Sequence, residues 1–284
     1  MKKFLALMLA MLMALSLVAC GGGNNAADNN DANNDPSGAA KTTLVLGTSA
    51  DYAPFEFMYP DPDPNKKGEM VYGGIDVSVA KYIADEMGLE LQVENMGFDY
   101  LLTSLDKGDF DIVLAAMEAT PDRLENADFS DPYYTDVPPA ILVKADKADQ
   151  YKTLADFNGK SIGAQTATTK LDMVNEMEGV NPVALQSVLD LVNELVYDKV
   201  DAILVDGGVA EEYAASNPDL VVAEASSELG QAAPYCVAVQ KGDPKGLLDG
   251  INAAIAKMNA ENKLESFIAD ADSLSNVAVN VTAE

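Results

Sequence analysis

The chain has 284 residues, with 46 acidic side chains against 18 basic ones, and no histidine. A formal net charge of −28 repels nucleic acids and anionic lipid surfaces, so neither is an expected partner. The lack of histidine excludes Ser-His-Asp and Cys-His catalysis, histidine metal sites and a histidine pH switch. We therefore expect no metal, no cofactor and no catalytic triad.

The N-terminus has the features of an export signal. Lys2 and Lys3 precede a short apolar run and a small-residue end, so residues 1–19 are predicted to be a signal peptide. The apolar run is shorter than the roughly 20 residues that a spanning helix needs. Cys20 ends the sequence Leu-Val-Ala-Cys, which resembles the lipobox of bacterial lipoproteins; the alternative is an ordinary signal peptide with a chance cysteine. Residues 20–41 are predicted to be a lipidated cysteine and a flexible linker.

The remaining sequence alternates strand and helix patterns and predicts an α/β fold with two mainly parallel sheets. Strands are predicted at 43–47, 89–94, 111–116, 140–144, 161–165, 201–206 and 234–240. Helices are predicted at 76–87, 188–196, 209–215 and 247–258, with another from Thr168 or Thr169 to Gly179 and a helical turn at 154–157. A loop is expected at 49–57 and a turn-rich excursion at 61–68.

A candidate binding residue follows the predicted strand at 111–116. Thr120 has the character of a helix N-cap, and Pro121 suits the first helical position. Arg123 would then lie at the start of a helix, beside the carboxyl end of a strand, where open α/β sheets bind ligands. A guanidinium at that place suits a carboxylate, although a solvated surface arginine remains the alternative.

A second copy of this pattern occurs later in the chain and supports a binding role for the first. Residues 101–115 align without gaps onto 191–205, each as a helix, a polar turn and an Asp-led apolar strand. The second copy ends at Asp206. Two equivalent strand ends, one approaching Arg123 and one ending in an aspartate, match the carboxylate and the ammonium of an α-amino acid.

Ordered motifs across 43–268 give the chain a resemblance to a known family. The motifs are Gly47-Thr48-x-x-x-Tyr52-x-Pro54-Phe55-Glu56-Phe57, Gly74-x-Asp76, Asp111-Ile-Val, Thr120-Pro-Asp-Arg123, Asp128-Phe-Ser-x-Pro132-Tyr133-Tyr134, Asp201-Ala and Lys241-Gly-Asp. With these motifs the chain resembles the extracellular solute-binding proteins of ABC importers, in the family specific for polar amino acids.

The resemblance implies a type II periplasmic-binding-protein-like fold, with two lobes that close on the ligand about a hinge of two crossing strands. Lobe 1 would comprise 43–136 plus 234–284, and lobe 2 would comprise 137–233. The expected protein is a monomer, located outside the cytoplasm and anchored to the membrane by lipid on Cys20. It would capture an amino acid and deliver it to an ABC transporter permease.

The resemblance also assigns roles to the charged and hydroxyl positions. Arg123 falls at the arginine that binds the ligand carboxylate. Thr168 and Thr169 match the pair at a helix start whose N–H and hydroxyl groups complete that site. Asp206 matches the aspartate that accepts the ligand ammonium.

Four further ligand contacts are implied. Tyr52 and Phe98 fall where the family places aromatic rings over the ligand side chain, and core packing is their alternative role. Ala115 and Met117 lie on the strand end whose backbone carbonyls can accept a further N–H from the ligand.

Three positions depart from the family pattern. Glu118 replaces a serine or threonine at the amino-group site, where a second carboxylate would need a cationic partner or a proton. Ser49 replaces an aspartate that some members use on basic or amide side chains, and Ala167 replaces a glycine. Counting Arg123 against Asp206 and Glu118 gives a pocket charge of about −1, which favours cationic or neutral polar amino acids over aspartate and glutamate.

Other functions stay open at this point. The ligand could be a peptide or a modified amino acid, or the scaffold could carry a dehydratase-like enzyme with Glu118 as general acid. A sensor module is a further alternative, although it would need another protein for its output. A binding protein is favoured over an enzyme, because Arg123 and Asp206 match the two charged groups of an amino acid and the chain has no histidine.

Overall fold

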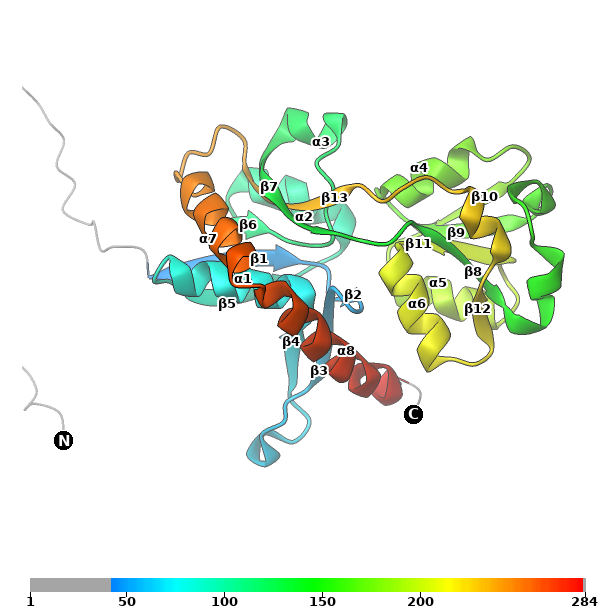
Figure 1. The fold of residues 1–284 in the computed structure, drawn as a ribbon, viewed down its shortest axis with the longest axis horizontal. Helices are drawn as coiled ribbons and strands as arrows, with labels where there is room; N and C mark the ends of the chain where they lie inside the picture. The colour runs from blue at the N-terminus through cyan, green and yellow to red at the C-terminus, as the bar shows by residue number, and fades with distance from the viewer. Residues whose placement is uncertain (1–41, 283–284) are drawn as a thin grey trace, which may run out of the picture. The chain divides into compact units, whose positions relative to one another are not determined.

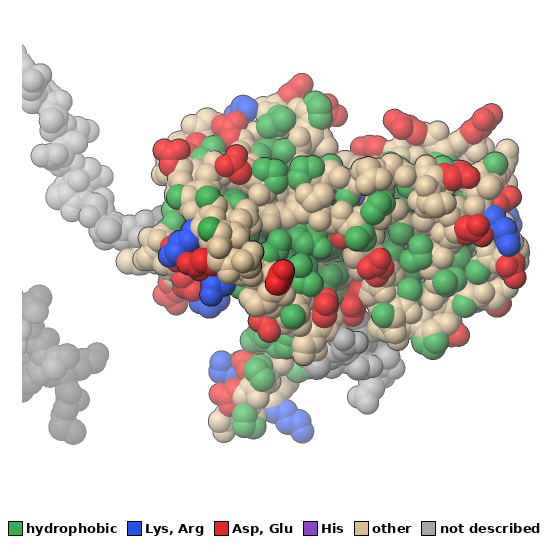
Figure 2. Space-filling model, in the orientation of Figure 1, with side chains coloured by type: hydrophobic (Ala, Val, Ile, Leu, Met, Phe, Trp, Pro, Cys, Tyr) green, Lys and Arg blue, Asp and Glu red, His purple; other side chains and the backbone are tan. Residues whose placement is uncertain are grey.

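The computed structural model describes residues 42–282, which form two five-stranded sheets and one three-stranded sheet (Figure 1). The predicted signal peptide, Cys20 and the linker to residue 41 lie outside the described residues. Within 42–282, none of the helices combines the length and apolarity that crossing a membrane requires. Acidic side chains outnumber basic ones over the face shown in Figure 2, as the net charge of −28 leads one to expect.

The first five-stranded sheet has the order β5-β1-β6-β13-β7. Its strands are β1 (Thr43–Thr48), β5 (Glu90–Asn95), β6 (Ile112–Val113), β7 (Ala127–Thr135) and β13 (Pro234–Gln240). β1 is parallel to β5 and β6, whereas β13 is antiparallel to β6 and β7. Four strands therefore share one direction and only β13 opposes them. The short strand β6 is buried on both faces, as its purely apolar sequence predicts.

The second five-stranded sheet repeats this arrangement in the order β10-β9-β11-β8-β12. Its strands are β8 (Ala140–Lys144), β9 (Ser161–Gln165), β10 (Asn181–Leu185), β11 (Ala202–Val205) and β12 (Leu220–Val222). Here β8 is the strand that opposes the other four. The predicted α/β class with two mainly parallel sheets is confirmed.

Helices cover the faces of the sheets (Figure 1). They are α1 (Ile75–Glu86), α2 (Leu101–Lys107), α3 (Pro121–Asn126), α4 (Thr169–Glu176), α5 (Val188–Val196), α6 (Gly207–Ser216), α7 (Leu248–Ala260) and α8 (Lys263–Thr282). Helix α5 shows why they form. The Ser187 hydroxyl accepts a hydrogen bond from Asp190 N, and the residues at i, i+3, i+4 and i+7 from Val188 are buried.

The chain passes between the two sheets twice, once after β7 and once before β13. These two strands pair with each other up to Pro234 and Thr135, so both crossings leave the first sheet at one place. An aromatic cluster packs beside them: the Phe55 ring lies 5.6 Å from Tyr134 and 5.3 Å from Tyr235, measured between centroids. The lobe boundaries at 136/137 and 233/234 stay a prediction.

Several elements were not predicted. The expected loop at 49–57 instead contains β2 (Asp51–Tyr52) and the start of β3 (Glu56–Pro60), which form the three-stranded sheet with β4 (Met70–Gly73). The turn-rich excursion at 61–68 is present, and it joins β3 to β4. Strands β7, β10 and β12 and the long helix α8 were also missed. The hairpin of β3 and β4 extends from the body of the fold next to α8 (Figure 1).

Candidate functional site

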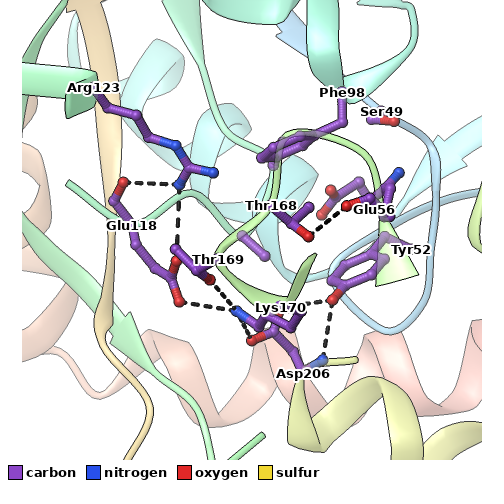
Figure 3. A pocket seen from close by; sticks show the side chains of 13 residues that line it. Ser49, Tyr52, Glu56, Phe98, Glu118, Arg123, Thr168, Thr169, Lys170 and Asp206 are labelled. Carbon is purple, nitrogen blue, oxygen red and sulfur yellow. Dashed lines mark hydrogen bonds and ion pairs between the residues drawn. The ribbon is translucent and has the colours of Figure 1, made fainter. Parts of the chain in front are cut away.

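A small enclosed site lies where the ends of β6, β9 and β11 face the β2–β3 segment (Figure 3). Its cavity volume is about 10 Å³, which is room for one water molecule. It is lined by Ser49, Tyr52, Glu56, Phe98, Ala115, Ala116, Glu118, Arg123, Gln165, Thr168, Thr169, Lys170 and Asp206. Eight of the nine ligand-contact positions predicted from the sequence are in this set.

Met117 is the ninth position, and the structure places it elsewhere. Its side chain is buried in an apolar cluster with Leu101 and Phe110, and it does not line the cavity. Its carbonyl accepts a hydrogen bond of 2.9 Å from Cys236 N. The buried thiol of Cys236 has the packing environment expected of a free cysteine in a strand.

Arg123 is set in place by the predicted helix start. The Thr120 hydroxyl accepts a hydrogen bond from Arg123 N, and Pro121 begins α3. The guanidinium donates to the Glu118 carbonyl at 3.0 Å and to the Ala167 carbonyl at 3.1 Å, and so joins the two lobes. Its central carbon lies 5.3 Å from the centroid of the Phe98 ring. Burial lowers the pKa of Arg123, while Glu118 opposes that shift.

Asp206 follows β11 directly and is the N-cap residue of α6. The Tyr52 phenol donates a 2.6 Å hydrogen bond to Asp206 Oδ2, and Asp206 N donates to the phenol oxygen at 3.1 Å. Burial, together with the Asp206 charge, raises the pKa of Tyr52 well above its usual range. Tyr52 thus contacts Asp206 through its hydroxyl, a role that the expected ring-over-ligand contact did not include.

Lys170 is the functional-site residue that sequence reasoning missed. Its ammonium donates to Glu118 Oε1 at 2.9 Å and to Thr169 Oγ1 at 3.2 Å, and it forms an ion pair with Asp206 Oδ1. Figure 3 shows the Lys170 nitrogen among these three side chains. Burial by itself lowers the pKa of Lys170, but Asp206 and Glu118 outweigh burial and raise it.

One sequence signal could have pointed to Lys170. It is the second residue of α4, and a cation in the first turn of a helix is disfavoured by the helix dipole. Such a position suggests a compensating anion. Lys170 is the cationic partner that Glu118 was expected to need, and with Arg123 it brings the formal charge of the four ionic groups to zero. The sequence-based total of about −1 did not include Lys170.

Glu56 contributes a third carboxyl group, after Asp206 and Glu118, and was not predicted to be at the site. It is 1% exposed, and its Oε2 has no hydrogen-bond partner among the described residues. Burial, followed by the charge of Asp76, raises the pKa of Glu56 well above its usual value. A buried carboxyl oxygen without a partner can accept a hydrogen bond from a bound molecule.

The loop that enters α4 has a strained backbone. Ala167 has a φ of 63°, in the left-handed region that glycine adopts more easily. The Thr168 hydroxyl donates to the Gln165 carbonyl at 2.6 Å and accepts from Leu171 N at 3.3 Å. These bonds fix the start of α4, and with it Thr169 and Lys170.

The family model for bacterial extracellular solute-binding proteins, family 3, matches residues 44–270. The chain belongs to this family. The resemblance inferred from the sequence motifs is therefore confirmed, and the chain is an extracytoplasmic solute-binding protein.

Relatives of this solute-binding protein match nearly its whole length. It is 34% identical over 271 residues to the arginine-binding extracellular protein ArtP of Bacillus subtilis, covering 93% of this chain and 96% of ArtP. It is 30% identical over 273 residues to a probable histidine-binding protein of Campylobacter jejuni, covering 94% and 98% of the two chains.

Solved structures confirm the two-lobed type II fold. The substrate-binding protein AbpA of Streptococcus pneumoniae, solved with L-arginine, has a TM-score of 0.76 and 30% identity, and the match covers 83% of this chain and 96% of AbpA. The ancestral amino-acid-binding protein AncCDT-1, a precursor of cyclohexadienyl dehydratase, has a TM-score of 0.70 and 31% identity, with 81% and 95% coverage.

Proposed function

We propose that this protein captures an amino acid between its lobes and delivers it to an ABC transporter permease. The observation that carries the proposal is the placement of charges around one cavity. Arg123 and the first turn of α4 bring a guanidinium and N–H donors to this cavity, and Asp206 and Glu118 bring carboxylates to it. An α-amino acid has a carboxylate for the first group and an ammonium for the second.

The guanidinium has donors to spare for a ligand carboxylate. It carries five N–H groups, and its hydrogen bonds to Glu118 O and Ala167 O use two of them. The first amides of α4 add donors at the positive end of a helix dipole. Thr168 and Thr169, which line the cavity, complete this carboxylate side.

The side-chain end of the pocket favours a cationic or neutral polar ligand. Glu56 lines this end with a buried carboxyl group, Ser49 with a hydroxyl and Phe98 with an aromatic ring. A guanidinium, imidazole or amide group could donate to the carboxyl oxygen and stack on the ring. Relatives named for arginine, histidine and cystine support this preference.

Opening of the lobes is part of the proposed cycle. A cavity of about 10 Å³ is too small for any amino acid, so the ligand must enter while the lobes are apart. Hinge motion at the two crossings after β7 and before β13 would allow that entry and then close over the ligand. The closed form is the shape that a permease would recognise.

Calorimetric titration with the twenty amino acids tests the proposal. We expect one amino acid, or a small related group, to bind the wild-type protein, with binding lost in Arg123→Ala and in Asp206→Asn. Asp149→Asn is the control, since that side chain is fully exposed and lies outside the cavity. Equal affinity of all four proteins for the same amino acid would contradict the proposal.

A second candidate function is a dehydratase-like activity, favoured by the likeness to a precursor of cyclohexadienyl dehydratase. Glu118 beside Arg123 would then be the general acid. Its ion pair with Lys170 argues against this role, because the carboxyl group already binds a cation of the protein. Incubation of the protein with bound ligand, followed by mass analysis of the ligand, separates the two functions.

The membrane attachment belongs to the same proposal. We propose that Cys20 becomes the lipidated first residue of the mature chain, on the strength of its place after the predicted signal peptide. Metabolic labelling with an alkyne fatty acid should tag the wild-type protein and leave Cys20→Ala untagged and released from the membrane fraction. Equal labelling of both proteins would contradict the anchor.

A further inference from the structure

The ammonium of Lys170 makes the contacts that a ligand ammonium would make. It bonds Glu118 and Thr169 and pairs with Asp206, so its three N–H donors face three acceptors. The Lys170 side chain is 6% exposed, and those of Glu118 and Asp206 are 8% and 6% exposed. The three acceptors form a binding site for one ammonium group, and the Lys170 side chain occupies it.

Asp206 has no oxygen left over in this arrangement. Oδ1 pairs with Lys170, and Oδ2 accepts the hydrogen bond from the Tyr52 phenol. The cavity beside them is about 10 Å³ in volume. Because so small a cavity has no room for a second ammonium beside Lys170, an incoming ammonium reaches Asp206 by taking the place of Lys170. An incoming carboxylate can instead bind the Arg123 N–H groups that are not used in the bonds to Glu118 O and Ala167 O.

Glu118 keeps the Lys170 ammonium in an ion pair when that ammonium moves away from Asp206. The 2.9 Å bond to Glu118 Oε1 does not depend on Asp206, so a small shift of the side chain keeps one ion pair intact. A zwitterionic ligand adds one positive and one negative charge, and the site stays neutral. At Asp206 the exchange replaces one ammonium–carboxylate contact by another of the same kind.

We propose that Lys170 determines specificity by standing in for the α-ammonium of the ligand between Glu118 and Asp206. The inference rests on the proposed function and deepens it. Because Lys170 already satisfies Asp206, an α-ammonium adds little net affinity. The pocket accordingly accepts carboxylate ligands without an α-amino group about as well as the matching α-amino acids.

The test compares ligands that differ only in the α-ammonium. L-arginine is paired with 5-guanidinopentanoate, L-histidine with imidazolepropionate, and L-glutamine with 4-carbamoylbutanoate. Each pair is titrated by calorimetry into the wild-type protein, the double variant K170M/E118Q and the control K152M. The double variant removes the lysine together with one carboxylate, because K170M alone would leave two buried carboxylates with Arg123, 3.8 Å from Glu118, as their one remaining cation among the four ionic groups. Lys152 is exposed and does not line the cavity.

We expect the two members of a pair to bind the wild-type protein and K152M within about threefold of each other. In K170M/E118Q the amino acid should bind more tightly than its partner by about tenfold to a hundredfold, the affinity equivalent of one charge-assisted hydrogen bond.

If all three proteins prefer the amino acid equally, or the wild type prefers it strongly, the proposed role of Lys170 is wrong. The proposed function is not affected by either result. Failure of all six compounds to bind any of the proteins overturns the proposed capture of such amino acids, and the inference with it.

Discussion

The phenol of Tyr52 and the carboxylate of Asp206, which are 154 positions apart in the chain, share a hydrogen bond of 2.6 Å. Tyr52 ends β2 beside the first sheet, and Asp206 begins α6 next to the second sheet. The bond therefore joins the two lobes across the candidate site. It also holds the carboxylate in the orientation in which Lys170 pairs with its other oxygen.

Tyr52→Phe should weaken ligand binding. The change removes one hydrogen bond to a charged group, of about 1.5–3 kcal/mol, and keeps the ring. If closure forms this bond, affinity for the best amino acid should fall about tenfold to a hundredfold in calorimetric titration. Tyr59→Phe, at a partly buried tyrosine outside the site, is the control. Unchanged affinity in Tyr52→Phe would show that the bond does not belong to the ligand-bound form.

The guanidinium of Arg123 offers a chemical test, since it is the single arginine of the whole chain. Phenylglyoxal should modify the ligand-free protein at this residue and abolish amino-acid binding. Bound ligand should slow the modification severalfold, because the carboxylate covers the N–H donors. Mass spectrometry of the peptide containing Arg123 measures the rate. Equal rates with and without saturating ligand would place the carboxylate elsewhere.

Ala167→Gly should stabilise the fold. A left-handed φ of 63° at a residue with a Cβ costs about 1–2 kcal/mol, and glycine removes that cost. Glycine also gives the unfolded chain more freedom, which offsets about 0.5–1 kcal/mol of the gain. The free energy of unfolding in urea should therefore rise by about 0.5–1 kcal/mol. Ala155→Gly, in the short helical turn Leu154–Phe157, has no left-handed φ and should lower it by about 0.5–1 kcal/mol. A loss of stability at residue 167 would contradict the strain argument.

Asp76 should make stability depend on pH. Burial raises the pKa of Asp76 to about 6, although the Ala116 amide and the Tyr133 phenol donate to it and oppose the shift. The folded state therefore keeps a proton that the unfolded state releases near pH 4, so this group's contribution falls as pH rises from about 4 to 6. Urea unfolding between pH 4 and pH 7 measures the slope.

Asp76→Asn should make the free energy of unfolding less dependent on pH, by the contribution of one proton. The loss of a hydrogen bond to the Asp76 carboxyl group can also lower stability, but it does so at every pH. Asp149→Asn is the matched control, because its side chain is exposed. An unchanged slope in Asp76→Asn would show that another group causes the pH dependence. Asp136, whose pKa burial also raises to about 6, would be the next to test.

Local sequence signals determined much of the fold and part of the site. The Thr120–Pro121 helix start placed Arg123, and the gapless repeat placed Asp206 at an equivalent strand end. Both rest on interactions between residues close in sequence, namely an N-cap, a proline at the first helical turn and apolar runs that form buried strands. Such signals can be read without knowing what packs against them.

Strand β7 could not be predicted from local sequence signals. Pro132 lies within it and lacks an N–H donor, so the local sequence does not favour a strand. The strand forms because β13 pairs with it, and the register shifts between Tyr235 and Ala238, around the position opposite Pro132. That irregular pairing joins segments more than 100 residues apart, so only the tertiary structure decided it.

The same limit explains Met117 and Lys170. The Met117 carbonyl lies on the expected strand end, but Cys236 from β13 takes its hydrogen bond. Lys170 occupies an unfavourable first-turn position that only Glu118 and Asp206, from two other parts of the chain, compensate. The sequence by itself determined the family, the strand ends and the opposite charges of Arg123 and Asp206. The tertiary structure decided which charges meet, because ion pairs between distant segments follow from packing and not from local pattern.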